Sequence, residues 1–332
     1  MEKIVVLVHG QWREKIFSPK YFERLQKSGE VKVYDRVDFA DKDYVVEFVK
    51  GATIIVTSWD SPVLDKEILD ACPDLKAVLH AAGSIKSVIS DEFVARKIRI
   101  TNSACAIGEG VAETALGFAL ASCKGFWTYN EDIHNGTWKR DNWTDYVKDF
   151  YDITVGVISG GFVGKHMVKL LKSFHVDILM YDPILTEEQI AEIGAKKVSL
   201  EELMSTADVV TIHAPSIPAT DNMINASNLK LMKDRAILIN TARGSIVNQD
   251  DLIAELKTGR ILACLDVFTP EPLPMDSELT KLPNAILTPH IAGICTNGFR
   301  RLSLHVCEEV ERLIAGEKMK AEVNLDNLSK LA

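Results

Sequence analysis

The chain has 332 residues, of which 26% are charged and 47% belong to the hydrophobic set. This composition is ordinary for a globular protein and excludes a disordered chain, a fibre or a coiled coil. With 38 Lys and Arg against 47 Asp and Glu, the net charge is −9. We therefore expect neither nucleic acid nor a membrane surface as a partner, although a small anion can still bind at a single Arg.

Cysteine usage and hydropathy indicate the compartment. The six cysteines are scattered, with no Cys-x-x-Cys pair, as expected for reduced thiols. The apolar run at residues 4–8 is too short for a signal-peptide core, and no stretch of about 18 apolar residues is apparent. We therefore expect a soluble cytoplasmic protein with no membrane-spanning segment. The histidines have no recognised metal-ligand spacing, so we expect no metal.

Short β-branched runs alternate with helical stretches, which predicts an α/β fold with a mostly parallel sheet. The length favours two domains. In the first hundred residues, strands are predicted at 4–8, 31–34, 53–56 and 76–79. Near residue 105 the pattern changes, because residues 107–124 carry few charges and predict a long helix that is buried or lies in an interface.

A second α/β series begins near residue 154. Its strands are predicted at 154–158, 178–181, 209–213, 236–240, 261–264 and 285–288. A helix is predicted between Asn248 and Gly259, because the Asn is a favourable N-cap, acids occupy the first turn and the Gly ends it. The two series together predict two α/β domains with a boundary near residue 105.

A glycine-rich turn follows the predicted strand at 154–158 and leads into a helix. Its sequence is Ser159-Gly160-Gly161-Phe162-Val163-Gly164. In a dinucleotide-binding fingerprint, such a turn lets backbone N–H groups approach a pyrophosphate at the helix N-terminus. The match is imperfect, since the pattern G-x-G-x-x-G requires Gly at position 159. A glycine-rich turn without a ligand is therefore the alternative interpretation.

Asp182 follows the next predicted strand, where an acidic side chain accepts hydrogen bonds from an adenosine ribose. Residues 183–188 contain no Arg or Lys that would pair with a 2′-phosphate. If a dinucleotide binds here, the sequence predicts NAD rather than NADP.

Three charged residues follow later strands, each beside Gly or Pro. They are Arg243 in Asn-Thr-Ala-Arg-Gly, Glu271 in Thr-Pro-Glu-Pro-Leu and His290 in Thr-Pro-His-Ile-Ala-Gly. Hydride transfer at a carbinol carbon needs an imidazole to move the hydroxyl proton, a carboxylate to support the imidazolium and a guanidinium to bind a carboxylate. Each residue alone has an ordinary structural explanation, but the set predicts a catalytic site.

The chain resembles the D-isomer-specific 2-hydroxyacid dehydrogenases over most of its length. The resemblance is carried, in that family's order, by Val111-Ala112-Glu113, by Val155-Gly156-Val157-Ile158 with the glycine-rich turn, and by the three segments around Arg243, Glu271 and His290. It implies an NAD-dependent oxidoreductase that interconverts a 2-oxo acid and a D-2-hydroxy acid. Arg243 would bind the substrate carboxylate and 2-oxo group, His290 would be the acid/base, and Glu271 would hydrogen-bond to His290.

The resemblance also implies the binding residues. Phe162 and Val163, between Gly161 and Gly164, would contact the pyrophosphate through backbone amides. Ala214, Thr241 and Ala242 would line the cofactor, and Asp266 would hold the nicotinamide carboxamide. The loop Ala82-Gly83-Ser84 would receive the substrate carboxylate together with Arg243 and His290.

The domain organisation implied by the resemblance is discontinuous. Two Rossmann-like or flavodoxin-like doubly wound parallel-sheet domains are expected, with the cofactor domain inserted into the substrate domain. Residues 1–105 and 293–332 would form the substrate domain, and residues 106–292 would form the NAD-binding domain. The helix at residues 107–124 would mediate homodimerisation.

Two residues depart from the family pattern. Ser159 replaces the first fingerprint glycine, so a slightly altered turn is expected, and Lys86 stands where the family has an acidic residue, which leaves the substrate open. The alternative function is an NAD(H)-sensing, corepressor-like binding protein with the same fold. The intact set of Arg243, Glu271 and His290 favours the enzyme.

Overall fold

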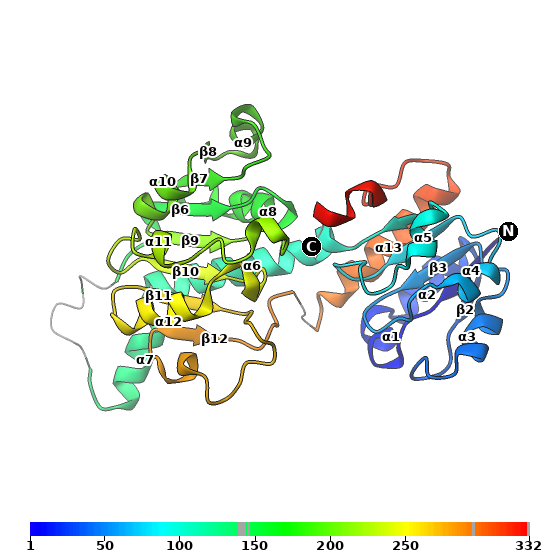
Figure 1. The fold of residues 1–332 in the computed structure, drawn as a ribbon, viewed down its shortest axis with the longest axis horizontal. Helices are drawn as coiled ribbons and strands as arrows, with labels where there is room; N and C mark the ends of the chain where they lie inside the picture. Colours follow the sequence, from blue (N-terminus) through cyan, green and yellow to red (C-terminus); the bar gives the residue numbers. More distant parts are fainter. Residues whose placement is uncertain (139–143, 145–146, 294–295, 331–332) are drawn as a thin grey trace. The chain divides into compact units, whose positions relative to one another are not determined.

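The computed structural model describes residues 1–138, 144, 147–293 and 296–330. The chain divides into two compact units (Figure 1). One, here called the discontinuous unit, combines Met1–Ile107 with Ile294–Ala332, and the other, the central unit, is Gly108–Gly293. Each unit has its own parallel sheet, which confirms the α/β fold class with two parallel-sheet domains.

The discontinuous unit contains a five-stranded sheet of order β2-β1-β3-β4-β5. Its strands are β1 (Glu2–Val6), β2 (Gly29–Val33), β3 (Ile54–Thr57), β4 (Ala77–His80) and β5 (Arg99–Thr101). Its helices are α1 (Gly10–Ile16), α2 (Pro19–Gln26), α3 (Lys42–Val49), α4 (Lys66–Asp70), α5 (Asp91–Ala95) and α13 (Phe299–Ile314), with a 3-10 helix η5 (Leu325–Lys330). Alternate residues of the strands face two separate cores, so α1, α2 and α13 cover one face and α3, α4 and α5 the other.

The central unit contains a seven-stranded sheet of order β12-β11-β10-β9-β6-β7-β8. Its strands are β6 (Tyr151–Ile158), β7 (His175–Tyr181), β8 (Lys196–Lys197), β9 (Val209–Ile212), β10 (Ile237–Asn240), β11 (Leu262–Leu265) and β12 (Ala285–Leu287). The strand order reverses direction at β6, which has β7 on one side and β9 on the other. In open parallel sheets, ligands bind beside the carboxyl ends of the strands at such a reversal.

Helices cover both faces of this sheet. They are α6 (Ala104–Cys123), α7 (Phe126–His134), α8 (Phe162–Leu171), α9 (Glu187–Ile193), α10 (Leu200–Thr206), α11 (Ala226–Leu229) and α12 (Gln249–Lys257), with 3-10 helices η2 (Pro218–Thr220), η3 (Gly244–Ile246) and η4 (Glu278–Lys281). Val155 and Val157 of β6 belong to the core shared with α6 and α8. On the other face, a Cβ at Gly156 would lie 2.5 Å from the Leu203 side chain of α10, so this glycine permits close packing there.

The predicted strands differ from the observed ones mainly at their ends. For example, the strand predicted at 4–8 is β1 (Glu2–Val6), and the helix predicted at 107–124 is α6 (Ala104–Cys123). The short strands β5 and β8 were not predicted. The latter is only the pair Lys196–Lys197 at the sheet edge, which carries no apolar signal.

Helix α6 is an exception to the expectation that no apolar stretch is long enough to cross a membrane. Its 20 residues, with mean hydropathy 1.3, meet that requirement by length and composition alone. A core helix of a globular domain meets it too. Ala112, Ala115 and Phe118 of α6 pack into the core of the central unit, so we interpret α6 as a core helix.

Two buried histidines predict acid destabilisation. Burial lowers the pKa of His213 to about 3, and burial lowers that of His80 to about 4 against the opposing effect of the Ser84 backbone. In the unfolded chain, both histidines become protonated near pH 6.5. Between these values the unfolded state binds more protons, so the free energy of unfolding falls as pH drops, by about 1.4 kcal/mol per pH unit for each histidine.

Chemical denaturation between about pH 7 and pH 5 measures this slope. We expect His213→Asn to flatten it, whereas His134→Asn, which changes an exposed histidine of α7, should leave it unchanged. An identical slope in wild type and His213→Asn would contradict the assignment.

Candidate active site

Strand register brings three loops to one edge of the central sheet. Asn240 at the end of β10 pairs with Leu265 of β11, which in turn pairs with Leu287 of β12. The strands are parallel, so the loops that follow them start side by side. These loops carry Arg243, Glu271 and His290.

The structure brings His290 and Glu271 into contact. Nδ1 of His290 lies 2.7 Å from Oε2 of Glu271, and Oε1 of Glu271 accepts a hydrogen bond from the Phe268 N–H at 2.9 Å. A carboxylate can only accept, so Nδ1 carries the proton in this pair. The imidazole side chain remains 46% exposed. With Nδ1 held in this way, Nε2 is the nitrogen available for proton exchange.

Arg243 lies in a loop that Asn240 holds in shape. The Asn240 side chain accepts a hydrogen bond from the Ala242 N–H at 3.0 Å and donates one to the Arg243 carbonyl at 2.9 Å. The guanidinium is exposed, and it donates to the Ala242 carbonyl at 2.7 Å. This leaves most of its N–H donors available for a carboxylate.

Gly244 lets the Arg243 loop lie directly against the Glu271 loop. A Cβ at this position would lie 2.0 Å from the carbonyl oxygen of Phe268, which is far inside contact distance. Sequence analysis did not identify Asn240 and Gly244 as residues that shape the site. The only signal in the sequence was their position at the end of a buried strand and in the loop that follows it.

Of the three glycines in the glycine-rich turn, Gly161 is open, whereas Gly160 and Gly164 are crowded. A Cβ at Gly161, the N-cap of α8, would meet only the Ser159 hydroxyl at 3.9 Å, whereas a Cβ at Gly164 would lie 2.0 Å from the Ser159 carbonyl oxygen. Gly161 therefore leaves space in front of the helix N-terminus, where Phe162 is half exposed. Ser159 itself has φ 79°, so serine adopts the left-handed conformation that glycine favours.

Asp182 is a buried carboxylate beside this turn. Its Oδ2 accepts a hydrogen bond from the Gly160 N–H at 2.8 Å, and its Oδ1 accepts from the N–H groups of Ile184 at 2.8 Å and Leu185 at 3.0 Å. Burial acts to raise the pKa of Asp182, but these bonds outweigh it and lower the pKa below its ordinary value. The group is therefore ionised at neutral pH.

The remaining predicted residues lie at strand ends. Ala214 and Thr241 are buried, at 6% exposure each, in the loops after β9 and β10, beside the half-buried Ala242. Asp266 follows β11 and is 0% exposed, with its carboxylate bonded to residues 288–292. In the discontinuous unit, Ala82-Gly83-Ser84 follow β4, and the Ala82 carbonyl accepts from the Ser103 N–H.

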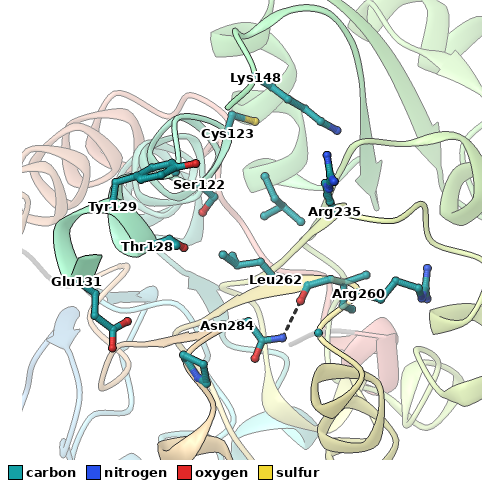
Figure 2. Close-up of a pocket in the computed structure, with 15 residues that line it drawn as sticks. Ser122, Cys123, Thr128, Tyr129, Glu131, Lys148, Arg235, Arg260, Leu262 and Asn284 are labelled. Carbon is teal, nitrogen blue, oxygen red and sulfur yellow. Dashed lines mark hydrogen bonds between the residues drawn. The ribbon is translucent and has the colours of Figure 1, made fainter. Parts of the chain in front are cut away.

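Two hollows lie at opposite ends of the strands of the central sheet. One, of roughly 570 Å³, borders Glu271 and His290 and is otherwise lined by uncharged residues such as Phe268, Leu273 and Leu287. The other, of roughly 280 Å³, is shown in Figure 2 and includes Lys148, Arg235, Arg260 and Asn284. Part of its lining comes from the end of α6 and from α7, and the other residues precede or begin β6, β10, β11 and β12. It therefore lies at the amino ends of the strands, away from the Arg243, Glu271 and His290 loops.

No potential metal site occurs in the part of the chain that the structure describes, where no group of three or more His, Cys, Asp or Glu side chains could hold an ion.

The family model for the D-isomer specific 2-hydroxyacid dehydrogenase, NAD binding domain, matches residues 116–292, which is more than half of the chain. The chain belongs to this family. The match confirms the resemblance found in the sequence and makes the protein an NAD-dependent oxidoreductase.

Individual relatives agree with this family assignment. The 2-hydroxyacid dehydrogenase chain is 33% identical over 290 residues to a glyoxylate reductase of Korarchaeum cryptofilum, with 86% of each chain covered. It is 30% identical over 306 residues to a D-3-phosphoglycerate dehydrogenase of Methanocaldococcus jannaschii, and it spans 57% of that longer protein. A phosphoglycerate oxidoreductase from Rhizobium etli has the same fold, with a TM-score of 0.84, 22% identity and coverage of 98% and 99% of the two chains.

The ionised Asp182 predicts discrimination between NADH and NADPH. Asp182→Asn removes a negative charge that would repel a 2′-phosphate while keeping the size of the side chain. We expect the ratio of the NADPH to the NADH dissociation constant, measured by fluorescence titration, to fall by about tenfold or more. General damage to the loop would weaken the binding of both cofactors and leave the ratio of their dissociation constants unchanged. An unchanged ratio would therefore contradict the role of Asp182.

Proposed function

We propose that this dehydrogenase interconverts a 2-oxo acid and a D-2-hydroxy acid. The observation that carries the proposal is the hydrogen bond between His290 and Glu271, which leaves Nε2 of the imidazole available at the carboxyl edge of the sheet. The exposed guanidinium of Arg243 lies in a neighbouring loop at the same edge. A proton donor and a carboxylate-binding group are the two functions that this reaction requires of the protein.

When NAD(H) is bound, it supplies or accepts the hydride at C2 of the substrate. In the reduction, Arg243 holds the substrate carboxylate and polarises the 2-oxo group. His290 then donates the Nε2 proton to the 2-oxo oxygen, which becomes the hydroxyl, and takes up another proton from solvent. Glu271 keeps the imidazole in one orientation and stabilises its positive charge. In the oxidation, Nε2 removes the hydroxyl proton.

Apart from the role of Asp266, the binding roles are assigned to the same residues as in the sequence analysis. Gly161, Phe162, Val163 and Gly164 would present backbone N–H groups to the diphosphate, Asp182 would accept from the ribose, and Ala214, Thr241 and Ala242 would line the cofactor. The open space at Gly161 and the ionised carboxylate of Asp182 support these roles. The Ala82-Gly83-Ser84 loop, and with it the discontinuous unit, would bind the substrate.

A reducing compartment is consistent with the chemistry of the thiols. In the described ranges, the buried residues Cys72, Cys123, Cys264 and Cys307 are free thiols. We propose a cytoplasmic location on this basis.

His290→Ala tests the assignment of the acid/base. With the proton donor removed, kcat for 2-oxo acid reduction by NADH should fall by about 100-fold or more. The NADH dissociation constant should stay within about twofold, because the imidazole has no part in cofactor binding. The substrate panel should include glyoxylate, pyruvate and 3-phosphohydroxypyruvate.

Glu271→Gln is the matched variant for His290→Ala, because it keeps the size of the side chain and removes the charge that supports the imidazolium. Its loss of kcat should be smaller. A wild-type protein that binds NADH but reduces none of these acids would favour the NAD(H)-sensing alternative, and unchanged turnover in His290→Ala would contradict the mechanism.

We also propose a homodimer formed through the helix at residues 107–124 and the segment that follows it. Phe126, Ile133 and Trp138 in this segment are 61%, 47% and 81% exposed. Large apolar side chains that cluster in one exposed segment are typical of surfaces covered by a partner. A second copy of the chain would cover them.

Sedimentation velocity tests the dimer. Phe126→Glu combined with Ile133→Glu should shift the protein from dimer to monomer, because it places charges in the apolar contact. Val63→Glu changes a half-exposed apolar residue of the discontinuous unit and should leave the dimer intact. A wild-type monomer, or a dimer that persists in the double variant, would exclude this surface.

A further inference from the structure

Asp266 is completely buried at the end of β11, yet all the bonds of its carboxylate go to one short turn. Oδ1 accepts hydrogen bonds from the Thr288 hydroxyl at 2.6 Å and from the Ile291 N–H at 2.9 Å. Oδ2 accepts one from the Ala292 N–H at 2.8 Å. The side chain is 0% exposed, so these partners replace water completely.

The backbone of Asp266 contacts the same turn. Its carbonyl accepts the N–H of His290 at 2.9 Å, and its own N–H donates to the Asn240 carbonyl at 3.0 Å. Asp266 therefore forms hydrogen bonds with His290 itself and with residues of the turn on both sides of it. It also ties the turn to β10, the strand that leads into the Arg243 loop.

His290 needs such support because its backbone is in an uncommon conformation. Its φ is 54°, in the left-handed region that residues other than glycine seldom adopt. A residue stays in this region only when its surroundings fix it there, and such residues are often found at functional sites. The neighbours Thr288 and Ile291, held by one carboxylate, flank His290 on both sides.

From these contacts we infer that Asp266 is a positioning residue, which holds the turn at 288–292 so that His290 Nδ1 meets Glu271. This role rests on the proposed proton transfer by His290. It differs from the role implied by the family resemblance, in which the carboxylate holds the nicotinamide carboxamide. In this structure the carboxylate is enclosed by its own chain, and its hydrogen bonds all go to the turn at 288–292.

Asp266→Asn is the sharpest variant. It keeps the shape of the side chain, but one acceptor oxygen becomes an NH₂ group, which cannot accept from the Ala292 N–H or from the pair at Oδ1. The turn should loosen even without cofactor. We expect amide hydrogen exchange at Ile291 and Ala292 to accelerate about tenfold or more in the cofactor-free protein.

The imidazole provides a second readout that does not depend on activity. In wild type the Nδ1 proton shared with Glu271 should give a protected NMR signal, and Asp266→Asn should lose it. The variant should also lower kcat by about tenfold while the NADH dissociation constant stays within about twofold. Asp276→Asn, which changes an exposed carboxylate in the nearby loop, is the matched control and should alter none of these quantities.

Thr288→Val provides the test if Asp266→Asn fails to fold. It removes one of the three side-chain bonds and leaves the charge in place, so exchange at Ile291 should accelerate by less than in Asp266→Asn. A tenfold loss of NADH affinity with unchanged amide exchange would overturn the inference in favour of a cofactor contact. If wild type reduces no 2-oxo acid, the proposed function fails, but the exchange and NMR results still decide whether Asp266 holds the turn.

Discussion

The hydrogen bond between His290 and Glu271 is the interaction on which the candidate active site depends. It is made by two loops that are exposed to solvent, so its geometry must come from the backbone beneath them. Glu271 is fixed by the Phe268 N–H, and His290 is fixed through the backbone of Asp266. Because β10, β11 and β12 are parallel and in register, these supports lie next to one another. The sheet thus determines the distance between His290, the proposed acid/base, and its partner Glu271.

Buried carboxylates stabilise the site through backbone amides rather than through cations. Asp182 accepts from the N–H groups of Gly160, Ile184 and Leu185, and Asp266 accepts from those of Ile291 and Ala292. Several amide donors compensate for the loss of water around a charge, while a cation would add a second charge to bury. Neither carboxylate engages Arg243, whose exposed side chain would bind an anionic substrate under the proposed function, although the net charge of the chain is −9.

Much of the fold could be predicted because several of its strands, such as β3 and β9, are β-branched runs buried on both faces. The strands β1, β3 and β9 were predicted from such runs. By contrast, β8 consists only of Lys196–Lys197 and contains no apolar residue that would predict a strand. The residues Arg243, Glu271 and His290 could be identified because each follows a strand beside Gly or Pro. Their roles came from a family resemblance, as did the discontinuous organisation, since periodicity does not show which distant segments share a sheet.

Other features could not be predicted because they depend on contacts between distant residues. Asp266 and Ala292 are 26 residues apart in the sequence, and only the folded sheet brings them within 2.8 Å. The left-handed backbone of Ser159 and His290 is likewise set by tertiary structure, since neither residue type favours it. The sequence showed that Ser159 departs from the fingerprint, but not that serine would adopt the conformation of the glycine it replaces.

The most direct test of the central claim is the fate of an isotope. When a 2-oxo acid is incubated with the protein and NADH that carries deuterium at the transferable position of nicotinamide C4, the account predicts a 2-hydroxy acid with deuterium at C2. Chiral chromatography with mass spectrometry should show the D-isomer. A product of L configuration, a product without deuterium, or NADH binding with no product from any 2-oxo acid would contradict the account.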